Sequence, residues 1–361
     1  MIGTTMFSYL FVRFLKVTGQ FFIGVTLISY MIDFTEFARS AGDAANYSFS
    51  TALALSALKM PFIIQLVVPF IIMFAAMTAL VALNRKYELV VARSAGLSAW
   101  QFLAPIGVAS LLVGLFTITV FNPLASASFS YAKELEAHIR GNESATPSRS
   151  IPWLSQRTDD GLAIIGAKSA LDRGKDLRGV TLMRFDDTDH LIERIEADRA
   201  VLRTGYWHLF NAQVIKDEGG RKREAQMRIG TNLKPEFVTE RLADPDTISL
   251  FELPHMIAVA RSLGLQANAF ATKMHSLFAL PFLLVAMSLI AATVSMRFVR
   301  MGQSVTVILG GILAGFLLYV VSVMVTALGS AGIMPPILAA WLPTIAASLF
   351  GVTFLLFKED G

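Results

Sequence analysis

The charged side chains best placed to bind another protein lie in residues 84–98, NRKYELVVARSAGLS, between two long apolar runs. The segment holds a single acid, Glu88, and its bases are Arg85, Lys86 and Arg93. A good N-cap residue at Asn84 and a helix-ending residue at Gly96 predict a short helix over this stretch. In such a helix Glu88 can neutralise Arg85 three residues earlier, or it can pair with an arginine on another protein.

The predicted helix is also amphipathic. Helical spacing places four residues on one face, namely Tyr87, Val90, Val91 and Ser94. Two interpretations remain open: a solvated connector between its neighbours, or a coupling helix that docks a motor protein. In the second interpretation the coupling residues are Tyr87, Glu88, Val91 and Arg93.

A second group of basic residues lies near the opposite ends of the apolar runs, and comprises Arg39, Lys59, Lys273 and His275. Each long basic side chain can reach toward lipid head groups on its own. Together the four can surround the mouth of a cavity and hold the head group of a phosphorylated amphiphile. The apolar walls below would then be Phe62, Phe70, Met73, Phe74, Phe278 and Phe282. The alternative for these apolar residues is ordinary packing between helices.

Motifs of catalysis are missing from the sequence. There is no GxxxxGK[ST] loop for nucleotide, no HExxH and no GxSxG. There is no cysteine, which excludes disulfides and thiolate metal sites. The centres of the apolar runs after the first hold no ionisable residue apart from His275, which argues against ion-coupled transport. We therefore expect no catalytic residue, no metal site, no cofactor and no nucleic-acid partner.

These residues are positioned by apolar runs long enough to cross a bilayer, which takes about 20 residues. Hydrophobic residues make up 54% of the 361-residue chain and charged residues 16%, as in membrane proteins. Six transmembrane helices are predicted, at residues 7–32, 60–83, 100–122, 274–296, 303–328 and 336–357. Basic residues in 84–98 and 297–302, with Arg13 and Lys16, place those loops and both termini in the cytoplasm.

The polar segment between the third and fourth spans has a different pattern. Residues 124–268 hold 20 Lys and Arg against 21 Asp and Glu. Short β-rich runs alternate there with turn signals such as Asp159-Asp160-Gly161, which favours a sandwich or a jelly roll. Residues 125–140 can extend the third helix. We thus expect three spans in 1–123, an external β domain with flanking helices in 124–268, and three spans in 269–361.

Small residues in the fifth predicted span form a GxxxG motif from Gly311 to Gly315. Such motifs let two helices approach closely, either inside one bundle or between subunits, and the sequence leaves both open. A polytopic chain with a cytoplasmic amphipathic helix and no energy source of its own fits the permease subunit of an ABC-type exporter.

The chain resembles the lipopolysaccharide export permease family, LptF and LptG, in topology and in several collinear stretches. These are DFTEFARSAG at 33–42, YELVVARSAGLS at 87–98, GVTLMRF at 179–185, TNLKP at 231–235, DPDTISLFEL at 244–253 and GIMPPILAAWLP at 332–343. The last three stretches are more similar to the G subunit than to the F subunit.

The resemblance implies a multi-pass protein of the bacterial inner membrane that extracts lipopolysaccharide and passes it to a bridge of periplasmic jelly-roll domains. The implied partners are a dimeric cytoplasmic ATPase (LptB-like), a paired permease subunit (LptF-like) and a single-span bridge protein (LptC-like). The acid of the family's ELV motif corresponds to Glu88 and implies contact with the ATPase. Asp33 stands where G subunits can carry a lipid-facing lysine. Two alternatives stay open: a permease of another lipid or lipoprotein extractor, and a membrane scaffold without transport.

Overall fold

The computed structural model describes residues 4–41, 48–94, 96–139, 154–158, 161–167, 169–171, 176–185, 191–216, 220–231, 244–262, 267–295 and 305–359. Contacts divide the chain into two compact units. The helical unit comprises Met1–Phe37, Ser56–Ser130 and Pro245–Gly361. The β unit comprises Ala38–Leu55 and Tyr131–Asp244.

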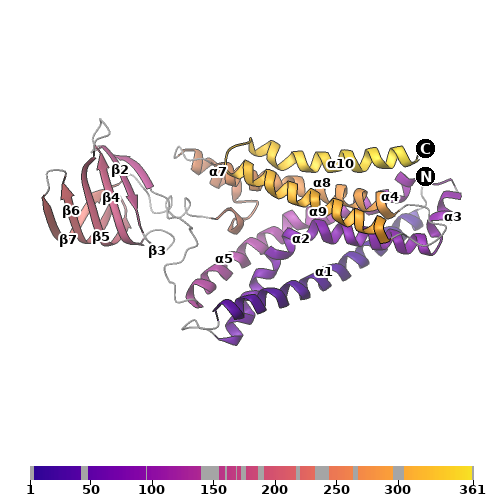
Figure 1. Cartoon of the computed structure of the whole chain (residues 1–361), viewed down its shortest axis with the longest axis horizontal. Coiled ribbons are helices and arrows are strands. Elements are labelled where there is room, and N and C mark those ends of the chain that lie inside the picture. The colour runs from indigo at the N-terminus through magenta and orange to yellow at the C-terminus, as the bar shows by residue number, and fades with distance from the viewer. Residues whose placement is uncertain are drawn as a thin grey trace. The chain divides into compact units, whose positions relative to one another are not determined.

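Within these described residues, six helices are long and apolar enough to cross a membrane, which confirms the predicted spans (Figure 1). They are α1 (Thr4–Ala41), α2 (Phe49–Arg85), a continuous helix formed by α4 (Ala99–Phe116), η1 (Thr117–Phe121) and α5 (Asn122–Ile139), then α8 (Asn268–Ser295), α9 (Val305–Ser330) and α10 (Pro336–Glu359). Shorter helices are α3 (Glu88–Ser94), η3 (Pro245–Thr247) and α7 (Leu253–Ser262).

Several helices run beyond the apolar segments that predicted them. The third helix continues to Ile139, as expected. The first continues past Ile32 to Ala41, because residues 33–41 contain neither glycine nor proline to stop it. Polar ends of this kind project beyond the hydrocarbon layer, where water can solvate their side chains.

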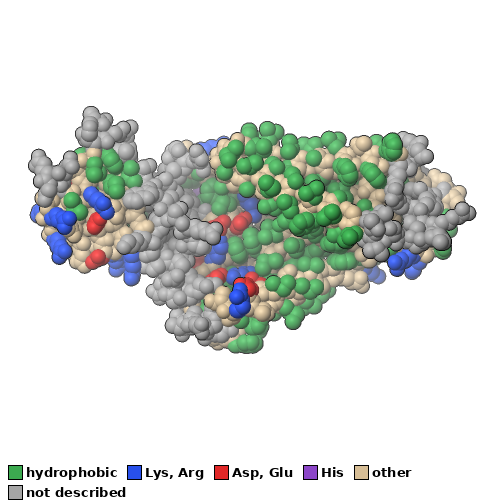
Figure 2. Space-filling model, viewed as in Figure 1, with side chains coloured by type: hydrophobic (Ala, Val, Ile, Leu, Met, Phe, Trp, Pro, Cys, Tyr) green, Lys and Arg blue, Asp and Glu red, His purple; other side chains and the backbone are tan. Residues whose placement is uncertain are grey.

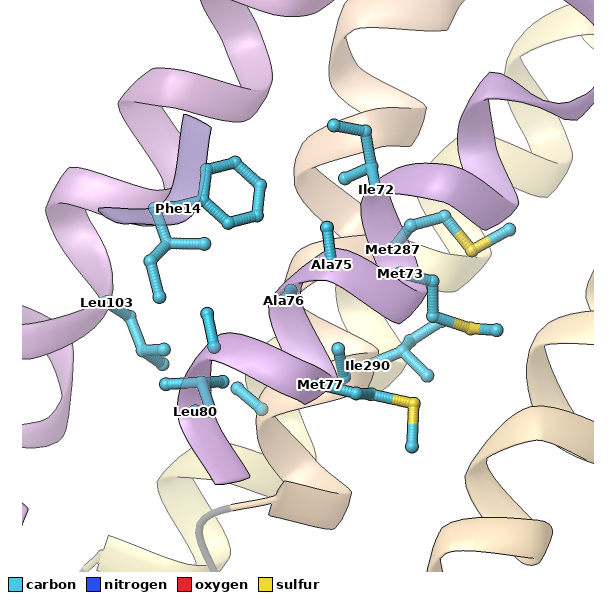
Figure 3. Packing of buried hydrophobic residues seen from close by; sticks show 14 of the residues in the cluster. Phe14, Ile72, Met73, Ala75, Ala76, Met77, Leu80, Leu103, Met287 and Ile290 are labelled. Atoms are coloured by element: carbon cyan, nitrogen blue, oxygen red, sulfur yellow. The ribbon is translucent and has the colours of Figure 1, made fainter. Parts of the chain in front are cut away.

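The spans differ in how much they are buried within the chain. The most apolar stretches of α2 and α8 are 61% and 67% buried, whereas those of α1 and α9 are only 11% buried. The core joins Phe14 of α1, Ile72 and Leu80 of α2, Leu103 of α4 and Met287 of α8 (Figure 3). Hydrophobic side chains also cover the visible face of the helical unit (Figure 2). The helices α1 and α9 therefore present apolar faces suited to lipid or to another subunit.

Glycines bring several pairs of helices into close contact. A Cβ atom on Gly114 of α4 would lie 2.5 Å from Cα of Pro281 in α8. One on Gly311 of α9 would lie 2.5 Å from a methyl of Val294, and one on Gly315 would meet Met73 of α2. Both glycines of the GxxxG motif thus face the chain's own bundle, which decides between the two alternatives in favour of packing within the subunit.

The β unit contains one antiparallel sheet. Its strand order is β1-β2-β4-β5-β6-β7, with β3 also paired to β4. The strands are β1 (Leu154–Thr158), β2 (Gly161–Gly166), β3 (Ser169–Leu171), β4 (Asp176–Phe185), β5 (Leu191–Arg203), β6 (Tyr206–Lys216) and β7 (Arg221–Gly230). The predicted all-β insert is confirmed. Its described strands follow a meander in which β2 and β3 share the edge of β4 opposite β5, without the crossing connections of a Greek key.

A transverse crease allows this single sheet to enclose a core. Gly179, Asp198 and Asn211 lie opposite one another in register on β4, β5 and β6, and none of the three is in a ladder pair. Gly179 has φ 59° and Asn211 has φ 54°, and the Asn211 amide donates to Asp198 at 3.0 Å. The buried positions shift by one residue at this row, for example from Ala197 to Ala200 on β5. Both halves of the sheet therefore point their apolar side chains into one core, which contains Trp207.

Candidate functional site

The short helix α3 begins later than the sequence predicted. The helix α2 continues through Asn84 to Arg85, so Asn84 is not an N-cap. Tyr87 then adopts φ 59°, and its N–H donates to the Asn84 carbonyl at 3.0 Å. A residue in this left-handed conformation ends one helix and redirects the chain. The carbonyl of Tyr87 accepts from the N–H of Val91 at 3.0 Å and so opens α3.

The far end of this connection agrees with the prediction. Gly96 has φ 83°, the conformation that suits a glycine after a helix. Ser98 then caps α4, since its hydroxyl accepts from the Gln101 N–H while the Gln101 side chain accepts from the Ser98 N–H. The helix α3 is thus fixed at both ends by defined turns of the backbone.

Opposite sides of α3 have opposite environments. Leu89 is 3% exposed and belongs to the core of the helical unit. Tyr87 and Val91 are 72% and 64% exposed. Large apolar side chains held outward on an anchored helix are typical of a protein contact surface. Arg93, the fourth predicted coupling residue, has its side chain outside the described part of the chain.

The carboxylate of Glu88 has partners within the chain that the sequence did not reveal. Arg13 of α1 lies 3.2 and 3.3 Å from its two oxygens, and the Tyr9 hydroxyl donates to it at 3.1 Å. Arg13 also donates to Tyr9 at 2.5 Å, with its guanidinium 5.6 Å from the centre of the Tyr9 ring. Glu88 therefore pairs with a residue 75 positions away in the sequence, and not with the neighbouring Arg85 that the sequence suggested.

The four predicted head-group residues have different surroundings. Lys273 donates to Asp246 at 2.6 Å, and its ammonium lies 5.6 Å from the centre of the Phe62 ring. Lys59 lies 5.4 Å from the centre of the Phe37 ring. His275 is half-buried on α8, and Arg39 is exposed in the last turn of α1, which belongs to the β unit. Among the predicted residues, the structure brings Lys273 and Phe62 together.

The residues of the predicted apolar wall contact different neighbours within the chain. Phe62 stacks on Phe129, Phe70 contacts Tyr319, Phe74 stacks on Phe21 and Phe282 lies against Trp341, while Phe278 is exposed. A cavity of about 290 Å³ has other walls: Leu15, Thr18, Gly19, Phe22, Val68, Ile71, Ile72, Val113, Phe116, Thr117 and Phe121. The sequence identified the residue types but not their directions around each helix.

A buried polar junction was missed altogether. The chain returns from the β unit through residues 245–252, which we call the return strap. The Asn122 side chain accepts from the Leu250 N–H at 2.8 Å and donates to Gln65 at 3.3 Å. Ser126 donates to the Ile248 carbonyl at 3.1 Å. With the Lys273–Asp246 pair, these bonds fasten the return strap to α2, α5 and α8, and the DPDTISL stretch in the sequence was the only signal of it.

The Lys273–Asp246 pair should be measurable by a double-mutant cycle. We expect Lys273→Gln and Asp246→Asn to lower the thermal stability of the purified protein non-additively, with a coupling of about 0.2–1 kcal/mol since Asp246 is partly exposed. If Lys273 also binds an anionic head group, Asp246→Asn should increase lipid binding and Lys273→Gln should reduce it. Strictly additive effects would contradict the pair.

Comparison with known protein families decides the identity. The model of the family described as "Lipopolysaccharide export system permease LptF/LptG" matches residues 8–357. The chain belongs to this family. It is therefore a permease subunit of a lipopolysaccharide export system, and a multi-pass protein of the inner membrane.

Individual relatives place it on the LptG side of the family. It is 23% identical over 349 residues to the lipopolysaccharide export system permease protein LptG of Haemophilus influenzae, covering 95% of this chain and 94% of that protein. It is 23% identical over 369 residues to LptG of Escherichia coli K12, covering 99% and 97%. The match extends over both units, so the β unit is part of the shared architecture.

Proposed function

We propose that the chain is the transmembrane half of an ATP-driven extractor, which takes lipopolysaccharide out of the membrane and passes it to a periplasmic bridge. Its partners are then a dimeric LptB-like ATPase, an LptF-like permease subunit and an LptC-like bridge protein. The sequence has no nucleotide-binding loop, so we assign ATP hydrolysis to the ATPase partner. Family membership and the six apolar helices support this proposal.

The proposal includes an orientation in the membrane. The connection around α3 carries Arg85, Lys86 and Arg93, and residues 297–302 add two arginines without an acid. Short loops rich in Lys and Arg remain in the cytoplasm. We therefore assign the α3 end and both termini to the cytoplasm, and the β unit to the periplasm.

The observation that carries the motor assignment is the outward face of α3. Tyr87 and Val91 are exposed, and they lie in the connection that we assign to the cytoplasm. Leu89 anchors the same helix in the core. A push on Tyr87 and Val91 thus reaches the packed helices directly, which a solvated connector would not achieve. Glu88 and Arg93 are the charged residues of the proposed contact.

Lipid contact is proposed for the basic residues at the opposite end of the spans. Arg39, Lys59 and Lys273 supply positive charge for phosphate groups, and Lys273 shares its charge with Asp246. His275 adds a ring N–H that can donate a hydrogen bond. The outward apolar faces of α1 and α9 are available to acyl chains or to the second permease subunit.

The test of the motor assignment is association with the ATPase. The variant Tyr87→Ser with Val91→Ser should weaken association of the purified permease with its ATPase roughly 30-fold, as loss of an apolar contact centre does. Val108→Ser, which changes an exposed valine on α4, serves as the matched control and should bind normally. Normal ATPase binding by the Tyr87 and Val91 variant would show that α3 is a connector. Mass spectrometry of lipid retained by the complex tests the cargo.

A further inference from the structure

The contacts of Glu88 point to a path for force inside the subunit. We infer that Arg13 and Tyr9 fasten α3 to α1, and that this tie transmits movement of the docked motor to α1. Arg13 and Tyr9 are thus positioning residues for energy coupling. The inference rests on the proposed docking of an ATPase at α3, and it names the chain's own Arg13 as the principal partner of Glu88.

In this tie, each of the three side chains Tyr9, Arg13 and Glu88 contacts the other two. Tyr9 and Arg13 lie four residues apart on one face of α1, so that the guanidinium stacks against the Tyr9 ring while both side chains reach the carboxylate. Arg13 is 18% exposed and Glu88 is 32% exposed. Because the Arg13 guanidinium is largely shielded from water, it depends on the Glu88 carboxylate as a partner. The carboxylate is more exposed, so it can also accept a hydrogen bond from a cation on the motor.

The packing of α1 explains why the tie matters. Near the tie, Leu10 and Phe14 are buried in the core of the helical unit. Further along, α1 turns large apolar side chains outward, namely Ile23, Leu27, Ile28, Met31 and Ile32. A helix of 38 residues is about 57 Å long, so a small tilt at the tied end gives a large displacement at the other. Movement of α3 is therefore expected to swing α1, which is one of the two least buried spans.

Exchange of the two charges tests the tie. Arg13→Glu leaves the proposed docking residues unaltered, so it should retain ATPase binding but lower lipid-stimulated ATP hydrolysis relative to basal hydrolysis about tenfold. Glu88→Arg should lower the stimulation as much and also weaken ATPase binding, because Glu88 belongs to the docking contact. Stimulation is therefore compared at ATPase concentrations that saturate each permease variant. The double variant Arg13→Glu with Glu88→Arg restores an opposite-charge pair and should recover most of the stimulation. Tyr9→Phe, which removes one hydroxyl, should give a smaller loss.

A matched control separates the tie from the general effect of charge on membrane insertion. Lys16→Glu makes the same charge change on the same helix, three residues from Arg13, and should leave the stimulation unchanged. A double variant no better than the worse single variant would overturn the inference and would place the partner of Glu88 on the ATPase. If Lys16→Glu equals Arg13→Glu, the tie is also rejected.

Failure of the proposed function gives a different result. If the unaltered permease binds no ATPase, the docking proposal fails, and the tie is then judged by thermal stability. In that measurement the double variant should be more stable than either single variant. Additive losses would reject the tie in the absence of any motor.

Discussion

Replacing Gly114 by alanine should destabilise the helical unit by about 1–3 kcal/mol, whereas Gly107→Ala on the same helix should be neutral. At Gly114 a Cβ atom would lie 2.5 Å from Cα and 2.9 Å from Cβ of Pro281. These atoms belong to the backbone and ring of α8 and cannot rotate away as a flexible side chain can. At Gly107 a Cβ atom would meet nothing within 4 Å.

The consequence should extend beyond the contact itself. The helix α8 is among the most buried of the spans, and it packs on α4, α9 and α10. Protein interiors are close-packed, so a shift of α8 is passed to its neighbours. We therefore expect Gly114→Ala to lower both the thermal unfolding temperature and the yield of assembled complex, and Gly114→Leu to lower them further.

Thermal unfolding of the purified protein in one detergent provides the measurement, with Gly107→Ala as the control. Equal unfolding temperatures for the two alanine variants would mean that α4 and α8 do not approach as closely as the structure shows.

Local properties of the sequence predicted the elements well. The six spans follow from runs of apolar residues, because each helix that crosses a bilayer must itself be long and hydrophobic enough. The β insert follows from short runs between turn signals, and the end of the α3 region follows from Gly96. The crease was visible in principle, since Ala197 and Ala200 are both apolar on β5 and break the two-residue alternation.

Contacts between residues far apart in the sequence could not be predicted from local sequence patterns. Glu88 meets Arg13 across 75 positions, and Lys273 meets Asp246 across 27. The start of α3 was misplaced because Asn84 is a good cap in isolation, yet the helix before it continues and Tyr87 supplies the turn. The aromatic wall stays a prediction, because an apolar transmembrane helix gives no periodicity from which to choose an inward side. The cavity of about 290 Å³ is lined by Phe22 and Phe121 among other residues.

Replacing Asn122 by alanine should loosen the return strap more than any other single change in that region. Asn122 is 1% exposed, and its side chain satisfies both the Leu250 N–H and the Gln65 amide. Each buried group left without a partner costs about 1–3 kcal/mol. Gln65→Leu keeps the bond to Leu250 and should therefore cost less.

The π-helical turn η1 determines where Asn122 points. Its wider winding lets the Asn122 N–H donate to the Thr117 carbonyl five residues earlier. An α-helix turns about 100° per residue, so without this turn the Asn122 side chain would be directed away from Gln65. Thr119 lies in the same turn, but its hydroxyl bonds only the Leu115 carbonyl in the contacts described, so Thr119→Val is a suitable control.

Hydrogen exchange of residues 245–253 measures the state of the return strap directly. Asn122→Ala should accelerate exchange at the Leu250 amide by the largest factor, Gln65→Leu by a smaller one, and Thr119→Val should leave it unchanged. Because the strap is the connection by which the chain re-enters the helical unit, Asn122→Ala should also reduce lipid-stimulated ATP hydrolysis while ATPase binding at α3 is retained. Equal exchange rates in the Asn122 and Thr119 variants would show that other contacts hold the return strap. The polar junction around Asn122 would then have no role in fastening the strap to the helical unit.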